Sequence, residues 1–160
     1  MSEYFRAGVG AVITDSVGRI LVFHRRCGDG FWQLPQGGIE QGEEPTEAVW
    51  REVMEETGLG REELRVTGQL GEWLTYELPA ESRSAKTGRG QVQWWFSMEL
   101  HDSFVNNPPV VLGGLDAAAE FDACRWTTPQ ELVEQAVPFR RLVYERIAFW
   151  LNERDQATDR

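Results

Sequence analysis

Long apolar runs are missing from this chain of 160 residues. No stretch approaches the roughly 18 consecutive apolar residues of a membrane-spanning helix, and the opening MSEYFRAG lacks the basic and apolar regions of a signal peptide. We therefore expect no membrane segment and a cytoplasmic location. A hydrophobic content of 41% with seven tryptophans predicts a globular protein, and the length fits a single domain over residues 1–160.

Cysteine and positive charge are also scarce. Cys27 and Cys124 lie far apart and form no CxxC motif, so we expect two small buried residues rather than a disulfide or a zinc site. The formal net charge of −10 argues against a protein that coats long nucleic acid through a basic surface. A site that binds only the phosphorylated end of a substrate is compatible with this charge.

The spacing of apolar residues predicts alternating strands and helices. Apolar runs at 7–14 and 19–24, joined by DSVG, predict a β-hairpin. We expect further strands at 63–70, 72–78, 91–100 and 120–126, loops at 80–90 and 102–119, and C-terminal helices at 128–136 and 139–153. The apolar face of the last helix should consist of Leu142, Ile147, Phe149, Trp150 and Leu151. Helices on both sides of a mixed sheet suit this order of elements.

Another helix is predicted from Pro45 to Thr57, inside the acidic segment GGIEQGEEPTEAVWREVMEETGL. Proline suits the first helical position and Gly58 suits the left-handed residue after the last turn, whereas Glu44 is a poor N-cap. The apolar side of this helix should be formed by Val49, Trp50, Val53 and Met54.

Glu52, Glu55 and Glu56 follow the i, i+3, i+4 spacing that places three carboxylates on one face of this helix. A solvated surface is the commonest place for three such glutamates taken alone. Like charges so close raise one another's pKa, however, and require a positive partner. Oxygen ligands without His or Cys suit Mg²⁺ or Mn²⁺, and the Gly-rich turn PQGGIEQG can approach an ion or a phosphate closely. This context favours a metal site.

The same segment matches the signature of a known family. The pattern is Gly, five residues, Glu, seven residues, Arg-Glu-apolar, one residue, Glu-Glu, one residue, Gly-apolar. The matching residues, without a gap or substitution, are Gly37, Glu43, Arg51, Glu52, Val53, Glu55, Glu56, Gly58 and Leu59. The chain therefore resembles the Nudix hydrolases. The resemblance implies an α/β fold, namely an α/β/α sandwich with a central mixed sheet and a C-terminal helix.

The resemblance also implies roles for the signature residues. The family hydrolyses a nucleoside diphosphate linked to another moiety. In the family, Mg²⁺ is held by carboxylates at the positions of Glu52, Glu55 and Glu56, often with the carbonyl of Gly37. The signature arginine, here Arg51, pairs with the earlier glutamate.

This chemistry requires metal ions that neutralise the pyrophosphate oxygens and a carboxylate that takes a proton from the attacking water. Glu52 and Glu120 are our candidates for that base. The resemblance makes Glu120 a further metal ligand as well, with an acid exposed at the start of a strand as the alternative.

Outside the signature, five segments resemble bacterial RNA pyrophosphohydrolases and the related dinucleoside polyphosphate hydrolases. They are WQLPQGGIEQGE, EWLTYELP, GQVQWWF, EFDACRW and VPFRRLVYERI. Substrate contacts are thereby implied for Arg6, one of Arg25 and Arg26, Tyr76, Phe139 and Arg140. A ring and a guanidinium can both stack on an unpaired base, although a core position is an equal alternative for Phe139 and for Tyr76.

The chain also departs from these relatives at three cationic positions. Glu77 stands where they have a lysine, GQVQWW brings Val92 and Trp94 in place of two more, and Ala7-Gly8 replaces Pro-Asn. Three basic residues of the neighbouring loop could supply the missing positive charges, namely Arg83, Lys86 and Arg89. The better explanation is that these side chains are simply solvated on a surface loop.

We therefore expect a Mg²⁺-dependent enzyme that removes pyrophosphate or phosphate from 5′-triphosphorylated RNA, or that cleaves dinucleoside polyphosphates. A mononucleotide or ADP-ribose pyrophosphatase of the same fold is the alternative. A Nudix module that senses a nucleotide without cleaving it would be expected to lack a metal glutamate, and none is lost here.

Overall fold

The computed structural model describes residues 3–26, 30–112 and 120–159. Cys27 and residues 113–119 of the expected loop lie outside this part. No helix among the described residues is both long and apolar enough to cross a membrane.

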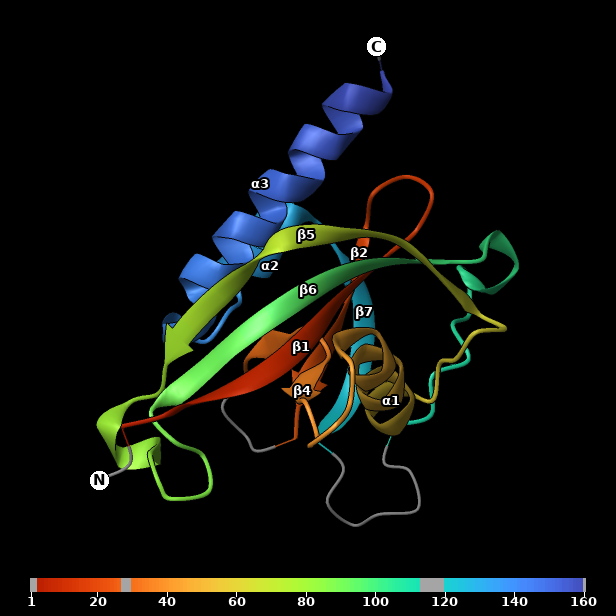
Figure 1. Cartoon of the computed structure of the whole chain (residues 1–160). Helices are drawn as coiled ribbons and strands as arrows, with labels where there is room; N and C mark the ends of the chain where they lie inside the picture. Colours follow the sequence, from red (N-terminus) through yellow and green to blue (C-terminus); the bar gives the residue numbers. More distant parts are fainter. Residues whose placement is uncertain (1–2, 27–29, 113–119, 160) are drawn as a thin grey trace.

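A mixed sheet forms the centre of the molecule (Figure 1). Its main path runs β3-β2-β1-β6-β5, while β4 pairs with β1 and β7 pairs with β2. The predicted hairpin is confirmed as an antiparallel β1–β2 pair, and β1 runs parallel to β6. The strands are β1 Phe5–Thr14, β2 Ile20–Arg25, β3 Trp32–Gln33, β4 Gln36–Gly38, β5 Leu64–Glu77, β6 Gly90–Leu100 and β7 Phe121–Thr127.

The two strands expected at 63–70 and 72–78 are one strand, β5. Its pairing with β6 shifts register between Gln69 and Trp73, and Gly71 has a φ of 85° there. A glycine in this left-handed conformation lets the strand bulge without ending. The break that we expected between residues 70 and 72 is therefore a bulge inside a continuous strand.

In the described part of the chain, three α-helices and three short 3₁₀ turns complete the fold. The helices are α1 Pro45–Thr57, α2 Pro129–Glu134 and α3 Arg141–Thr158, and the turns are Ala80–Ser82, Asp102–Phe104 and Pro138–Arg140. The bounds of α1 agree with the prediction, and Gly58 ends it with a φ of 75°. At its start, the carboxylate of Glu47 accepts a hydrogen bond of 3.1 Å from the Glu44 N–H, so the poor N-cap residue is compensated.

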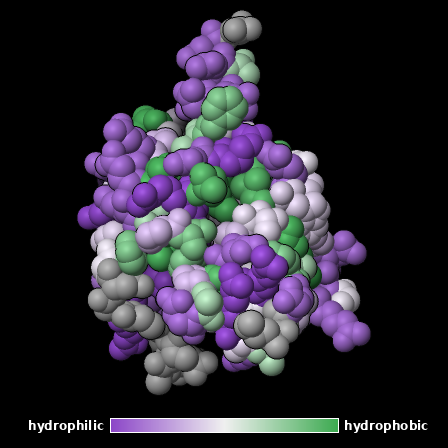
Figure 2. Space-filling view, turned by 90° about the vertical axis from the view of Figure 1, so that its left-hand side faces the viewer, coloured by the Kyte–Doolittle hydropathy of each residue, from purple (hydrophilic) through white to green (hydrophobic). Residues whose placement is uncertain are grey.

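The expected α/β/α layers are present, with α1 on one face of the sheet and α2 and α3 on the other (Figure 1). Val49 and Val53 of α1 pack in one core with Phe96. Tyr144 and Ile147 of α3 belong to a second core on the opposite face. The C-terminal end of α3 projects from the body and is mostly hydrophilic (Figure 2).

Part of the predicted apolar face of α3 is wrong. Leu142 is 77% exposed and Phe149 is 57% exposed, whereas Val143 and Tyr144 are buried. The helix begins two residues later than expected, and its buried stripe follows positions 143, 144, 147, 150 and 151.

Two smaller expectations about burial also need correction. Met54, which was expected on the apolar side of α1, is half exposed. Cys124 is a free cysteine that is only half-buried against the first core.

Candidate active site

The turn between β3 and α1 positions the backbone of the site. Val9 of β1 pairs with Gly37 of β4, and the buried Leu34 N–H donates a hydrogen bond of 2.9 Å to the hydroxyl of Tyr144. A Cβ atom at Gly37 would collide with the carboxylate of Glu52. Glycine is therefore required at position 37 because the Glu52 carboxylate lies against its backbone.

Arg51 connects this turn to α1. Its Nε and Nη2 donate to the carboxylate of Glu43 at 2.8 and 2.9 Å, and Nη2 also donates to the Gly38 carbonyl at 2.8 Å. Its Nη1 donates to Glu52 at 2.9 Å and to Glu55 at 3.3 Å. The bonds from Arg51 lower the pKa of Glu43 to about 2. The expected pairing of the signature arginine with the earlier glutamate is confirmed.

Glu56 and Glu120 meet on the other side of the carboxylate group. Glu56 is partly buried and accepts a hydrogen bond of 3.1 Å from the Gln36 N–H. Burial, and after it the charge and hydrogen bond of Glu120, raise the pKa of Glu56 well above its ordinary value. Glu120 precedes β7 and is held by a backbone bond of 2.8 Å from the Arg26 N–H to its carbonyl.

The carboxylates of this group influence one another electrostatically. Burial raises the pKa of Glu52 in spite of its bond to Arg51, and the charges of Glu55 and Glu120 add to the rise. Arg51 is in contact with the α1 carboxylates Glu52 and Glu55, but its shortest bond to a carboxylate goes to Glu43. The group therefore combines hard oxygen donors with incompletely compensated negative charge, which is the chemistry that suits a divalent cation.

The carboxylate oxygens of this group do not surround a common point in the structure. Among the described residues, no set of three or more His, Cys, Asp or Glu side chains is arranged to hold an ion. The contacts explain this, because Glu52 and Glu55 are hydrogen-bonded to Arg51 while Glu56 is hydrogen-bonded to the Gln36 N–H. Small side-chain rotations would be needed for these carboxylates to share an ion.

Tyr76, Phe139 and Arg140 form a second cluster. The rings of Tyr76 and Phe139 lie 5.6 Å apart, and the Arg140 guanidinium lies 5.3 Å from each ring centre. Arg140 is only 9% exposed and donates a hydrogen bond of 2.5 Å to Gln33. Phe139 belongs to the 3₁₀ turn before α3 and is half-buried. The sequence predicted Phe139 and Arg140 beside a base and Tyr76 near the phosphates, but it did not predict that the Arg140 guanidinium is buried at equal distance from both rings.

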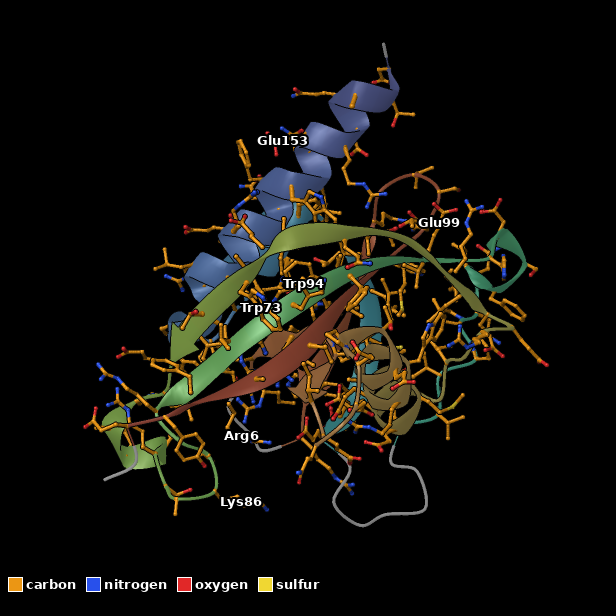
Figure 3. The ribbon with its side chains drawn as sticks, viewed as in Figure 1. Arg6, Trp73, Lys86, Trp94, Glu99 and Glu153 are labelled. Atoms are coloured by element: carbon orange, nitrogen blue, oxygen red, sulfur yellow. The ribbon has the colours of Figure 1, made fainter. Side chains whose placement is uncertain are left out.

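The remaining arginines of the expected substrate site flank the carboxylates. Arg6 lies at the open start of β1 (Figure 3), and its Nη2 would be 2.7 Å from a Cβ atom at Gly38. Arg25 pairs with Phe121 across the β2–β7 ladder, and Arg26 follows at the surface. The Arg26 backbone thus contacts Glu120, Arg25 pairs with the residue that follows Glu120, and Arg6 lies near the residue that follows Gly37.

Glutamines were missed as members of the site. The Gln93 amide donates to Gln36 and, at 2.9 Å, to Gln91, while the Tyr76 hydroxyl donates to Gln36 at 3.4 Å. The alternation in GQVQ was the available signal, because residues two apart on a strand share a face. These amides link the carboxylate turn to the aromatic cluster.

Trp94 and Glu77, which stand where the relatives have lysines, both make contacts within the protein. Trp94 packs against Trp73 on β5, with ring centres 5.1 Å apart (Figure 3). Arg83 and Arg89 both pair with Glu77, at 3.4 and 3.0 Å. Both loop arginines therefore have a protein carboxylate as partner.

Comparison with known proteins agrees with this geometry. A family model described as "NUDIX domain" matches residues 4–147, and the chain belongs to the Nudix hydrolase family. Within it, the chain falls in the RNA pyrophosphohydrolase branch. The RNA pyrophosphohydrolase of Rhodospirillum rubrum is 38% identical over 148 residues, which cover 89% of this chain and 84% of that protein. Nudix hydrolase 25 of Arabidopsis thaliana is 36% identical over 150 residues, with coverages of 89% and 83%.

Solved structures share the fold at lower identity. The Escherichia coli dihydroneopterin triphosphate pyrophosphohydrolase aligns with a TM-score of 0.71 at 22% identity, over 91% of this chain and 97% of that one. A Caenorhabditis elegans Ap4A hydrolase aligns with a TM-score of 0.66 at 19% identity, over 92% and 98%. These likenesses support the architecture alone.

Proposed function

We propose that this chain is a Mg²⁺-dependent pyrophosphohydrolase that removes pyrophosphate or phosphate from 5′-triphosphorylated RNA ends. Dinucleoside polyphosphates are the second substrate class of the proposal, and Mn²⁺ could replace Mg²⁺ because it accepts the same oxygen donors. The proposal includes a cytoplasmic location, which fractionation of the source cell would check.

The observation that carries the proposal is that the Glu52 carboxylate lies against the Gly37 backbone and Glu56 accepts a hydrogen bond from the adjacent Gln36 N–H. The charge of Glu120 acts on both of these carboxylates. The choice of RNA ends rests on the similarity to proteins named RNA pyrophosphohydrolase from several bacteria. The overall charge is compatible, because an unpaired 5′ end inserted in one site needs no basic coat.

In this proposal Gly37, Glu52, Glu55, Glu56 and Glu120 hold the metal. A bound Mg²⁺ would neutralise phosphate oxygens and lower the pKa of a water molecule. Arg51 keeps Glu52 and Glu55 oriented through its bonds from Nη1.

The base that takes the proton from water is Glu52 or Glu120, and each has a supporting contact. Glu52 lies against Gly37 and bonds to Arg51. Glu120 acts on the partly buried Glu56 and helps to raise the pKa of that carboxyl group. Arg6, Arg25, Arg26, Tyr76, Phe139 and Arg140 would contact the phosphates and bases of the substrate.

The test is a comparison of kcat/KM with Mg²⁺ on three substrates: a short 5′-triphosphorylated RNA with an unpaired end, diadenosine tetraphosphate and ADP-ribose. We expect the RNA to have the highest value. Glu55→Gln should abolish the activity, whereas Glu62→Gln, a change of an exposed glutamate outside the group, should not alter it.

The alternatives give different rankings. A clear preference for ADP-ribose or a mononucleotide would replace the RNA assignment by a small-nucleotide pyrophosphatase of the same fold. Binding of nucleotides without turnover of any substrate would instead make the protein a sensing module.

A further inference from the structure

A stack of three side chains on the edge of the sheet has no part in the function described so far. The guanidinium of Arg125 on β7 lies 3.9 Å from the centre of the Trp32 ring. The His24 ring on β2 lies 5.1 Å from the same tryptophan at 56°. We call these three residues the edge stack.

The structure holds the Arg125 guanidinium in a fixed orientation. Its Nη2 donates a hydrogen bond of 2.7 Å to the Gln135 side chain, while the Gln135 carbonyl accepts 3.3 Å from the Trp32 N–H. Arg125 is exposed and Trp32 is half-buried against the second core. A flat guanidinium fixed on a ring, with its other side toward solvent, needs little ordering before a base stacks on it.

The acids near the edge stack have partners of their own. Asp122 bonds to the Nδ1 atom of His24 at 2.7 Å. Glu131 accepts hydrogen bonds from the Thr127 hydroxyl at 2.7 Å and from the Thr128 N–H at 3.3 Å as part of the cap of α2. Arg125 is hydrogen-bonded to the Gln135 amide rather than to a carboxylate, and the nearby charge of Glu131 acts on it without a hydrogen bond. Its guanidinium can therefore still meet an anionic chain.

The edge stack is continuous with the carboxylate group along one ladder. The Arg26 N–H bonds to the Glu120 carbonyl, Arg25 then pairs with Phe121, and further along Val22 pairs with Arg125. At about 3.3 Å per residue, Arg125 is roughly 16 Å along the strand from Glu120. A second contact at that distance suits a ligand that extends beyond its reacting phosphates.

We propose that the edge stack binds an unpaired base of single-stranded RNA, one or more nucleotides downstream of the reacting 5′ end. The inference rests on the proposed function, because it assigns the downstream part of that substrate. The stack would make the enzyme prefer a longer RNA over a dinucleotide, which lacks a downstream base.

The test measures binding as a function of RNA length. In a Glu55→Gln background with Mg²⁺, unlabelled ligands would compete with a fluorescent octanucleotide in an anisotropy assay. The competitors are 5′-triphosphorylated RNAs of eight and two nucleotides, an octanucleotide with a 5′-hydroxyl and diadenosine tetraphosphate. The variants are Arg125→Gln, Arg125→Lys and, as matched control, Arg65→Gln on β5, where the arginine is paired with Glu99 far from the edge stack.

We expect Arg125→Gln to weaken binding of both octanucleotides by about fivefold or more. Binding of the dinucleotide and of diadenosine tetraphosphate should change less than about twofold, and Arg65→Gln should change nothing. Arg125→Lys should weaken RNA binding as much as Arg125→Gln does, because lysine keeps the positive charge but lacks the planar guanidinium on which a base can stack.

Three results would overturn the inference: equal affinity of wild type for the long and the short RNA, equal weakening of all competitors, or full rescue by lysine. Failure of the proposed function looks different. Suppose that no RNA is hydrolysed but binding of the octanucleotide with a 5′-hydroxyl still requires Arg125. The edge stack is then correctly assigned as an RNA-binding site, and the proposed reaction is wrong.

Discussion

At the scale of single residues, the contact between Gly37 and Glu52 ties the backbone turn to the helix. Gly37→Ala should push the Glu52 carboxylate aside, because that carboxylate occupies the space of the new methyl group. Misplacing a catalytic group by about 1 Å can cost about 10²-fold, so we expect a fall of this order in kcat/KM. The melting temperature should change little, since the displaced atoms are the far end of a flexible side chain.

Gly68→Ala on β5 serves as the matched control for this change. The nearest atoms to its methyl group are side-chain atoms at 3.3 Å or more, outside the carboxylate group. An activity of Gly37→Ala equal to that of Gly68→Ala would contradict the proposed position of Glu52.

Glu43 provides a prediction about pH. Its pKa is lowered from 4.5 to about 2 by the hydrogen bonds from Arg51, and after them by the bond from the Glu40 backbone. A carboxyl group with a lowered pKa stabilises the fold fully above pH 4.5, and this contribution disappears as the pH falls through the folded-state value. Glu43→Gln should therefore reduce the urea midpoint at pH 7, and the difference from wild type should shrink below pH 4.5 and vanish near pH 2.

Glu40→Gln separates this effect from a general loss of charge. Glu40 is 3.9 Å from Arg51 and is 70% exposed, so its removal should leave the urea midpoint almost unchanged. A difference between Glu43→Gln and wild type that is constant from pH 7 to pH 2 would refute the ionic contribution.

At the scale of elements, α1 brings several carboxylates together on one face. Binding of Mg²⁺ to the folded protein alone would raise its stability, by about 1.4 kcal/mol at ten times the dissociation constant. For a chain of this length that corresponds to roughly 3–5 °C in melting temperature. Glu56→Gln should reduce the gain, because it removes a charged oxygen donor of the proposed site, and thermal melts across a Mg²⁺ titration would measure it.

Glu62→Gln should show the full gain, because this exposed glutamate lies outside the carboxylate group. A melting temperature independent of Mg²⁺, or an equal gain in both variants, would remove the metal site from α1.

At the scale of the whole molecule, α3 supports the active-site turn from the opposite side of the sheet. The Tyr144 hydroxyl accepts the hydrogen bond of the buried Leu34 N–H at 2.9 Å. Tyr144→Phe would leave that N–H without a partner, which costs about 1–3 kcal/mol of unfolding free energy. We expect this loss in chemical denaturation, together with a lower kcat/KM because the same turn positions Gly37.

Tyr4→Phe removes a hydroxyl of the same kind from an exposed site. Its hydroxyl bonds to the Ala85 carbonyl, and the ring is 45% exposed, so water can replace the bond. Equal stability of the two phenylalanine variants would show that α3 does not support the turn through Tyr144.

Local spacing explains which features could be predicted from the sequence. The bounds of α1, the shared face of its glutamates and the β1–β2 hairpin all follow from residues within a few positions of one another. The periods of the helix and of the strand determine these relations before any packing is known. The same reasoning was wrong for Leu142, because the boundary of α3 and its packing against β5 decide which side is buried.

By itself, the sequence determined the family, the layered α/β fold and the acidic helix, since a signature at fixed spacing requires no knowledge of distant contacts. Only the tertiary structure decided that Glu120 acts on Glu56, that the buried Arg140 lies beside the rings of Tyr76 and Phe139 and that Arg125 lies over Trp32. Each of these contacts joins residues far apart in the chain. Their positions depend on strand order and on the packing of α2 and α3, which no local period specifies.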